Sequence, residues 1–197
     1  MTIRNATPSD APFLAKCLMA GLHIYDFEKE IPESKDVFRR FTECAQSDNL
    51  LYTYRNSRVA EVDGQLAGAL LSYPGEIYKE LRQRTFTEPW PDFANVDGIF
   101  EQETGPGEFY LDTLAVLPSQ RGQGIGRALI HDAIERGISL GYDKITLLVD
   151  PGMPHLIRLY SSVGFTLADR CHAFGVDFQR MVYSHINKAS ASPGKCQ

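Results

Sequence analysis

The sequence predicts an α/β (α+β) domain in which helices flank a central sheet of about six to seven strands. Three observations support this fold class. The chain has 197 residues, 43% of them hydrophobic and 23% charged, which is enough to bury one substantial core. An Asp-Gly pair at 63–64 separates two β-like runs. A third β-like run, at 109–116, leads through a glycine-rich loop into a long amphipathic stretch.

The N-terminal part of the chain predicts one short strand and two helices. Residues 3–6 form the β-like run, and Thr7-Pro8-Ser9-Asp10 then supplies capping residues that favour a helix start. From Glu33 to Gln46, apolar side chains recur at helical spacing, at Val37, Phe38, Phe41 and Ala45. We expect this second helix to pack on the sheet.

The second and third strands are predicted as a hairpin. Residues 58–62 and 65–72 are β-like runs on either side of Asp63-Gly64. Asp-Gly is among the strongest short-range signals for a two-residue hairpin turn, because both turn positions need a positive φ.

Residues 75–108 are interpreted as an acidic insertion between the third and fourth strands. A helix is expected from about Ile77 to Arg84, after which prolines and glycines interrupt the chain. Eight acidic and three basic side chains give this segment a charge of −5, equal to the net charge of the whole chain. Such a concentration of negative charge suits cationic partners.

From residue 109 onward, strands and helices alternate regularly. The expected strands cover residues 109–116, 144–149, 165–168 and 174–183. The expected helices cover residues 124–140, which Gly141 ends, and residues 155–163, which follow a break at 150–154. We therefore expect a single domain over residues 1–187 and a flexible tail over 188–197.

Charge, apolar runs and cysteines disfavour several classes of partner. A net charge of −5 disfavours nucleic acid and anionic membrane as general partners. The N-terminus does not resemble a signal peptide and no run reaches the ~18 apolar residues of a membrane helix, so a cytoplasmic location is expected. The four cysteines lie far apart without zinc-site spacing, which predicts reduced thiols and no metal.

The segment Arg121-Gly122-Gln123-Gly124-Ile125-Gly126 has the chemistry of a phosphate site. Glycines let a chain expose successive N–H groups, and a helix N-terminus adds about half a positive charge. A Walker A loop requires Gly-Lys-Ser/Thr, but Arg127-Ala128 follows Gly126. The dinucleotide pattern Gly-x-Gly-x-x-Gly also fails, because its third glycine position falls on Arg127 or Leu129.

What this spacing does resemble is the acyl-CoA pyrophosphate loop of the GNAT acetyltransferase family, Gln/Arg-x-x-Gly-x-Gly/Ala, which Arg121, Gly124 and Gly126 match. The resemblance covers about residues 109–165. It includes Leu114-Ala115-Val116 before the loop and the later segment Leu159-Tyr160-Ser161-Ser162-Val163-Gly164-Phe165. It implies a GNAT-type mixed, mostly antiparallel sheet that is splayed between the fourth and fifth strands.

The resemblance implies an N-acetyltransferase that uses acetyl-CoA, in which a primary amine of a small molecule or peptide attacks the thioester directly in a ternary complex. It places the pantetheine arm on the backbone of Leu114, Ala115 and Val116. It places the pyrophosphate on the N–H groups of Arg121, Gly122, Gln123, Gly124, Ile125 and Gly126. The acceptor, the acyl-chain preference and the choice between monomer and homodimer are left open.

One departure from the family pattern supports an alternative function. Many family members carry an Asn seven residues before the helical tyrosine, near the pantetheine arm, and Met153 stands there in this chain. A non-catalytic acyl-CoA-binding sensor domain is therefore the alternative.

Two catalytic residues follow from the resemblance. Tyr160 matches a tyrosine that points at the CoA sulfur, so it is the expected general acid, with core packing as the alternative. Asp112 lies where some members carry a catalytic Glu, so it is the expected base through a bridging water. Glu108 is a second candidate base, and a solvated strand carboxylate is the alternative reading of Asp112. Glu101 and Glu103 are expected to form an acidic rim that favours a cationic amine.

Overall fold

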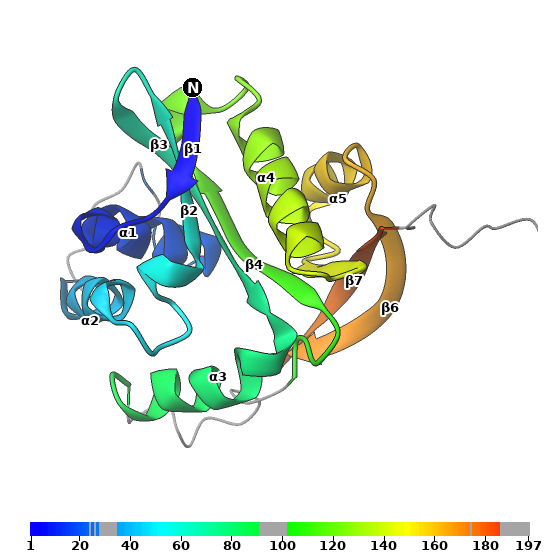
Figure 1. Cartoon of the computed structure of the whole chain (residues 1–197), viewed down its shortest axis with the longest axis horizontal. Coiled ribbons are helices and arrows are strands. Elements are labelled where there is room, and N and C mark those ends of the chain that lie inside the picture. The colour runs from blue at the N-terminus through cyan, green and yellow to red at the C-terminus, as the bar shows by residue number, and fades with distance from the viewer. Residues whose placement is uncertain (24, 26, 28–34, 91–101, 174, 186–197) are drawn as a thin grey trace, which may run out of the picture.

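The computed structural model describes residues 1–23, 25, 27, 35–90, 102–173 and 175–185. These residues form a seven-stranded sheet in the order β1-β2-β3-β4-β5-β7-β6, with helices on both faces (Figure 1). Neighbouring strands are antiparallel except β4 and β5, which are parallel. The predicted fold class, a mixed and mostly antiparallel sheet flanked by helices, is confirmed.

Up to residue 90, the described residues form three strands and three α-helices. Their bounds are Thr2–Asn5 (β1), Ala11–Gly21 (α1), Lys35–Gln46 (α2), Ser57–Val62 (β2), Gln65–Pro74 (β3) and Tyr78–Thr87 (α3). The predicted hairpin is confirmed, because Asp63 and Gly64 join β2 to β3 with φ angles of 50° and 75°. A 3-10 turn over Pro8–Asp10 begins α1, and the Asp10 carboxylate accepts a hydrogen bond from the Thr7 N–H at 2.7 Å.

From residue 102 onward, the described residues form four strands and two α-helices. Their bounds are Phe109–Val116 (β4), Ile125–Ser139 (α4), Lys144–Val149 (β5), Pro154–Ser161 (α5), Thr166–Ala173 (β6) and Val176–Ser184 (β7). β4 and β5 begin and end as predicted. β6 continues to Ala173 where the sequence predicted an end at Ala168, because an exposed edge strand accommodates charges such as Asp169 and Arg170. Residue 174, the predicted tail and residues 91–101 of the insertion lie outside the described residues.

Two layers of helices enclose the sheet. The side chains of α1, α2 and α3 pack on one face around Leu71, Tyr73 and Tyr110. Those of α4 pack on the other face around Phe109 and Leu111, and α5 lies on the same side (Figure 1). A third apolar cluster, which includes Leu14, Val59 and Ala69, joins α1 to β2 and β3.

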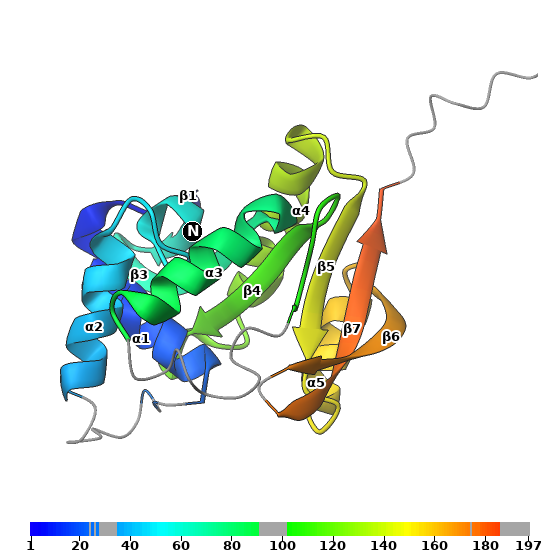
Figure 2. The ribbon, with the colours of Figure 1, turned by 90° about the horizontal axis from the view of Figure 1, so that it is seen from below.

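The sheet opens between β4 and β5 because their pairing is short. The paired residues are Phe109–Ile145, Tyr110–Thr146 and Leu111–Leu147, whereas β4 continues to Val116. Figure 2 shows the two strands adjacent at one end and separated at the other. The predicted splay between the fourth and fifth strands is therefore confirmed, and it begins at Asp112.

A β-bulge in β4 coincides with the start of the splay. Opposite β3, Leu71 pairs with Thr113 and Ser72 pairs with Leu111, so Asp112 is the extra residue. The Thr113 hydroxyl donates a hydrogen bond to the Asp112 carboxylate at 2.7 Å, which shows that the two consecutive side chains lie on the same side. Bulges commonly redirect a side chain toward a functional site.

Two further sequence expectations concern the environment of the protein. Cys17, Cys44 and Cys171 are free thiols, the first two buried, while Cys196 lies outside the described residues. Within the described ranges, no helix is both long and apolar enough to cross a membrane.

Candidate active site

A cavity of about 820 Å³ occupies the opening between β4 and β5. Residues 112–116 of β4 and residues 148–149 of β5 line its sides, and the end of α1, the glycine-rich loop and α5 complete the wall. Such a volume falls in the range of small-molecule and cofactor sites. Asp112, Tyr160 and all the predicted cofactor-binding residues except Gln123 line it. The Gln123 side-chain amide donates a hydrogen bond to Gln120 at 3.2 Å.

The glycine-rich loop forms one end of the cavity. Gly122 and Gly124 have φ angles of 78° and 81°, a conformation that L side chains rarely adopt. A Cβ atom built at either position would have no neighbour within 4 Å, so the glycines leave open space for a ligand. Gly124 is the N-cap of α4, whose first N–H groups have no partner within the helix. The loop therefore has the geometry of an anion site.

The backbone of β4 forms a second surface of the cavity. Because pairing with β5 ends at Leu111, the β5-facing edge from Leu114 to Val116 is not covered by that strand. The Arg121 side chain donates from Nε to the Val116 carbonyl at 3.1 Å, which ties the loop to the end of β4. An extended ligand could pair with this edge as an added strand would.

Tyr160 lies on α5 and lines the same cavity. Its ring packs edge-on against Phe165 at a centroid distance of 5.9 Å, and Leu156 and Leu159 line the cavity beside it. Burial in these apolar surroundings raises the pKa of Tyr160 to about 12. The phenol is therefore protonated at neutral pH and can donate a hydrogen bond into the cavity.

Asp112 is half-buried and faces the cavity from the bulge in β4. Its carboxylate accepts hydrogen bonds from the Tyr73 hydroxyl and from the Thr113 hydroxyl. Burial raises the pKa of Asp112 above its ordinary value, although these two donors and the nearby Arg82 charge act in the opposite direction. A carboxylate with a raised pKa is a better proton acceptor than an ordinary surface aspartate.

Glu103 corrects the expectation of an acidic rim. It is only 7% exposed, yet it lines the cavity beside Tyr110 and Asp112. The Tyr78 and Tyr110 hydroxyls donate to its two oxygens at 3.0 and 2.9 Å, and the Arg82 guanidinium lies 2.7 Å from one of them. Glu103 is therefore a buried wall residue, and no local pattern in the sequence marks it as one. Glu101 lies outside the described residues.

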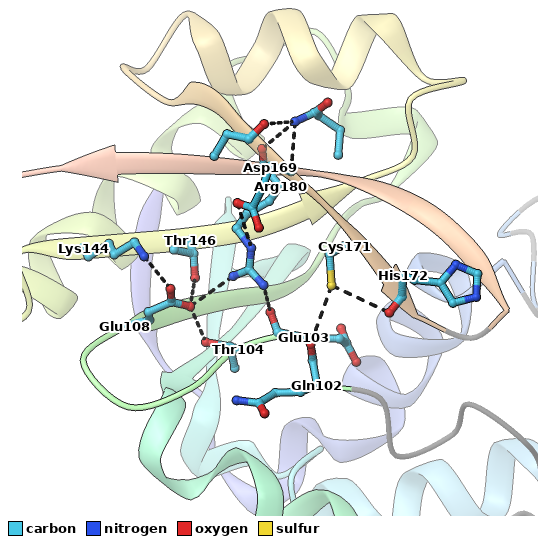
Figure 3. Close-up of polar contacts among 12 residues, drawn as sticks. Gln102, Glu103, Thr104, Glu108, Lys144, Thr146, Asp169, Cys171, His172 and Arg180 are labelled. Atoms are coloured by element: carbon cyan, nitrogen blue, oxygen red, sulfur yellow. Dashed lines mark hydrogen bonds and ion pairs between the residues drawn. The ribbon is translucent and has the colours of Figure 1, made fainter.

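Glu108, the second candidate base, is held by ion pairs and hydrogen bonds. It lies 2.8 Å from Lys144 and 3.2 Å from Arg180, and the Thr104 and Thr146 hydroxyls donate to it (Figure 3). Burial alone would raise the pKa of Glu108, but the hydrogen bond from Lys144 and the neighbouring charges lower it. Glu108 does not line the cavity, so the geometry favours Asp112 over Glu108 as the base.

The substituted position Met153 also lines the cavity, as the N-cap residue of α5. Its backbone N–H donates to the Asp150 carbonyl at 2.9 Å, closing the turn that precedes α5. The methionine side chain cannot supply the amide hydrogen bonds of an asparagine.

A mixed sheet that is splayed beyond three parallel residue pairs, with a glycine-capped helix at one end of the opening, defines a GNAT-type fold. The comparison with protein families agrees, because the model described as "Acetyltransferase (GNAT) family" matches residues 19–165. The chain therefore belongs to the GNAT acetyltransferase family.

Curated relatives share part of this chain. It is 42% identical over 75 residues to a mycothiol acetyltransferase of Thermobispora bispora. The matched residues cover 38% of this chain and 25% of that protein. It is 35% identical over 116 residues to the mycothiol acetyltransferase of Kineococcus radiotolerans, covering 52% and 37% of the two chains. The chain thus spans about a quarter to just over a third of these two relatives.

A further relative is matched over more of its own length. The L-methionine sulfoximine/L-methionine sulfone acetyltransferase of Salmonella typhimurium is 28% identical over 129 residues, which cover 64% of this chain and 71% of that protein. 

Solved structures share the fold over nearly the whole chain. A crystal structure of an acetyltransferase has a TM-score of 0.77 and 27% identity, covering 94% of this chain and all of that one. The structure of AAC(6')-Ib in complex with ribostamycin and coenzyme A has a TM-score of 0.61 and 23% identity, covering 93% and 92%. At 23% identity, the similarity to AAC(6')-Ib shows a shared fold and nothing more.

Proposed function

We propose that the protein is an N-acetyltransferase that moves the acetyl group of acetyl-CoA to a primary amine by direct attack in a ternary complex. The observation that carries the proposal is that the glycine loop, the open edge of β4, Asp112 and Tyr160 all line one cavity. Membership of the GNAT acetyltransferase family supports acetyl-CoA as the donor, and AAC(6')-Ib, which shares the fold, has structures in complex with coenzyme A and acetyl-CoA.

The residues present fit a bound acyl-CoA. The N–H groups at the start of α4, with Gly122 and Gly124 leaving space before them, would hold the pyrophosphate. The backbone of Leu114, Ala115 and Val116 would hold the pantetheine arm along the open edge of β4. Most of this binding would rest on backbone groups, which is consistent with a methionine at position 153.

Asp112 and Tyr160 would share the proton transfers. An alkylamine with a pKa of ~10.4 is neutral in only about one molecule in a few thousand at pH 7, so Asp112 would take its proton, directly or through water. The neutral nitrogen then attacks the carbonyl carbon and the C–S bond breaks. Tyr160 would donate to the departing sulfur.

The raised pKa of Tyr160 limits how far its proton moves. A phenol with a pKa of about 12 and a thiol with a pKa of ~8.5 differ enough to make full transfer uphill by about 5 kcal/mol. We therefore assign Tyr160 the role of a hydrogen-bond donor to the sulfur. Its proton would move fully to the sulfur only if the apolar wall also raised the pKa of the thiol.

Acetyl-CoA should stabilise the protein through the glycine loop. At about 100 times its Kd it should add about 2.7 kcal/mol and raise the melting temperature, while NAD and ATP should not. Gly124→Ala should weaken acetyl-CoA at least about tenfold, because its Cβ would occupy the space before the helix N-terminus. Gly64→Ala is the matched control: Gly64 also has a positive φ, of 75°, and open surroundings, but it lies in the β2–β3 turn.

Release of free thiol from acetyl-CoA, measured with a panel of amines, tests turnover itself. Turnover with at least one primary amine is expected. Acetyl-CoA binding without turnover for any amine would favour the acyl-CoA sensor instead, and no stabilisation by acetyl-CoA would exclude both functions.

Tyr160→Phe should lower kcat by about 10–10²-fold, because a hydrogen bond to a group that develops charge is worth about 1.5–3 kcal/mol. The KM values should change little, since the ring that packs on Phe165 is retained. Leu159→Met, a substitution on the same helix that keeps an apolar cavity wall, serves as the control. Steady-state kinetics would contradict the assignment if Tyr160→Phe kept the kcat of the parent protein.

A further inference from the structure

The cavity has an uneven distribution of charge. Among the described residues that line it, the lysines and arginines are limited to Arg121 and Arg127, which belong to the glycine loop or follow it directly. The end formed by Tyr52, Tyr110 and the β4 bulge contains two carboxylates, Asp112 and Glu103. This acceptor end therefore attracts cations and contains no described lysine or arginine to pair with an anion.

The buried charges behind this end do not balance. Arg82 is 2% exposed and lies 2.7 Å from Glu103, and its charge also acts on Asp112. Arg82 does not line the cavity, so a ligand there cannot pair with it. With both carboxyls ionised, one guanidinium faces two carboxylates, so among the residues that the structure describes the cluster has one positive charge fewer than negative charges.

Glu103 is held in place from several sides. Both of its oxygens receive tyrosine hydrogen bonds, from Tyr78 and Tyr110. Its backbone carbonyl accepts a hydrogen bond of 3.0 Å from Arg180 on β7, which also pairs with Glu108 and so fixes the segment before β4 (Figure 3). The Glu103 carboxylate is therefore a fixed part of the cavity wall, and its charge is presented at a defined place.

We propose that the acceptor is a primary amine without a carboxylate beside its amino group, bound as an ammonium ion between Asp112 and Glu103. The inference rests on the acetyltransferase function proposed above. The ammonium supplies the positive charge that the cluster lacks, and the aromatic rings of Tyr52, Phe27 and Phe178 suit the apolar part of the amine. The carboxylate of an α-amino acid would instead meet two fixed carboxylates, which is repulsive in a partly desolvated site.

The reaction balances in protons and electrons. The bound ammonium gives one proton to the Asp112 carboxylate, and the freed nitrogen lone pair forms the bond to the acyl carbon. The electron pair of the C–S bond stays on sulfur, which Tyr160 stabilises with a hydrogen bond and which takes up one of the two protons that leave the nitrogen. The amide nitrogen loses a second proton to solvent, so one proton is released overall for each ammonium acetylated.

Matched acceptors test the proposal on the unmodified protein. Tyramine is compared with tyrosine and agmatine with arginine, since each pair differs by one carboxylate next to the amine. Both kcat/KM and the dissociation constant in the presence of coenzyme A should favour the amine at least about tenfold. Tyrosine methyl ester, which keeps the bulk but not the charge, should bind closer to tyramine than to tyrosine. Equal values for amine and amino acid would overturn the proposal.

Variants of the protein test whether Glu103 causes the preference for amines over amino acids. Glu103→Gln should reduce the amine preference about tenfold and change the acetyl-CoA dissociation constant less than about twofold. Glu103→Asp, which retains the charge, should keep most of the preference. Glu80→Gln makes the same change at an exposed position on α3, outside the cavity wall, and should leave the preference intact even though it loses its pair with Arg84. An unchanged preference in Glu103→Gln would reject the assignment.

Binding measured without turnover separates this inference from the proposed function. Amine binding that depends on Glu103, in a protein that never releases thiol, would support the inference and reject the acetyltransferase. Thiol release that does not distinguish amines from amino acids would support the acetyltransferase and reject the inference. If amine binding does not depend on Glu103 and no thiol is released, both the inference and the acetyltransferase function are rejected.

Discussion

Asp112→Asn should lower kcat/KM for an alkylamine acceptor by about 10²–10³-fold, within the range that general base catalysis contributes. Asparagine has nearly the shape of aspartate, and its oxygen can still accept the hydrogen bonds of Tyr73 and Thr113. It cannot take a proton from an ammonium ion. The affinity for acetyl-CoA should stay within about twofold, because the β4 contacts proposed for the donor come from backbone groups.

The pH dependence of the same comparison gives a second readout. Because burial raises the pKa of Asp112, its carboxylate is protonated at a higher pH than that of an ordinary aspartate. The rate of the parent protein should therefore fall as the pH is lowered through this raised value, and Asp112→Asn should lose that dependence. Asp112→Glu, which keeps an ionisable group, should retain it. A parent-like rate in Asp112→Asn would remove Asp112 from the mechanism.

Arg82→Met should destabilise the fold by about 3–5 kcal/mol, the usual cost of breaking one side of a buried ion pair. The guanidinium is 2% exposed and lies 2.7 Å from Glu103, so its loss leaves a buried carboxylate without its counter-charge beside Asp112. Urea or thermal unfolding measures the change. Arg84→Met on the same helix removes a partly exposed pair with Glu80 and should cost less than about 1 kcal/mol.

The pH at which Arg82→Met is measured should matter. Burial already raises the pKa of Glu103 in the parent protein, and removal of Arg82 should raise it further. A carboxyl whose pKa is higher in the folded than in the unfolded state makes the protein lose stability as the pH rises through that value. The stability deficit of Arg82→Met should therefore shrink as the pH is lowered. A deficit that does not depend on pH would point to lost packing instead.

Local signals explain which parts of the fold were predicted from the sequence. The Asp63-Gly64 turn requires positive φ angles that few residue pairs adopt, and β4 and β5 are short buried runs, so their positions were predicted. The end of β6 was missed because an exposed edge strand carries the same polar residues as a loop. Resemblance supplied the splay, since no local pattern shows where two parallel strands stop pairing.

The same distinction applies to the candidate site, where some residues carry a signal in the sequence and others do not. The glycine loop could be proposed from its spacing, and Tyr160 from the resemblance of the segment Leu159 to Phe165 to the GNAT family. The role of Glu103 could not be predicted, because its partners come from α3 and β4, and only the folded chain brings them together. Its neighbour in the same acidic segment, Glu108, looks alike in sequence but pairs with Lys144 and Arg180 outside the cavity.

The short parallel contact between β4 and β5 has a mechanical consequence. Three residue pairs join these two strands, so within the sheet β1–β4 and β5–β7 behave as two ribbons attached at one end. A small change in twist at this attachment would widen or narrow the free ends without breaking the ladders within either ribbon. A substrate that contacts both ribbons would act as a brace between them, so its departure would release the two ribbons to move apart.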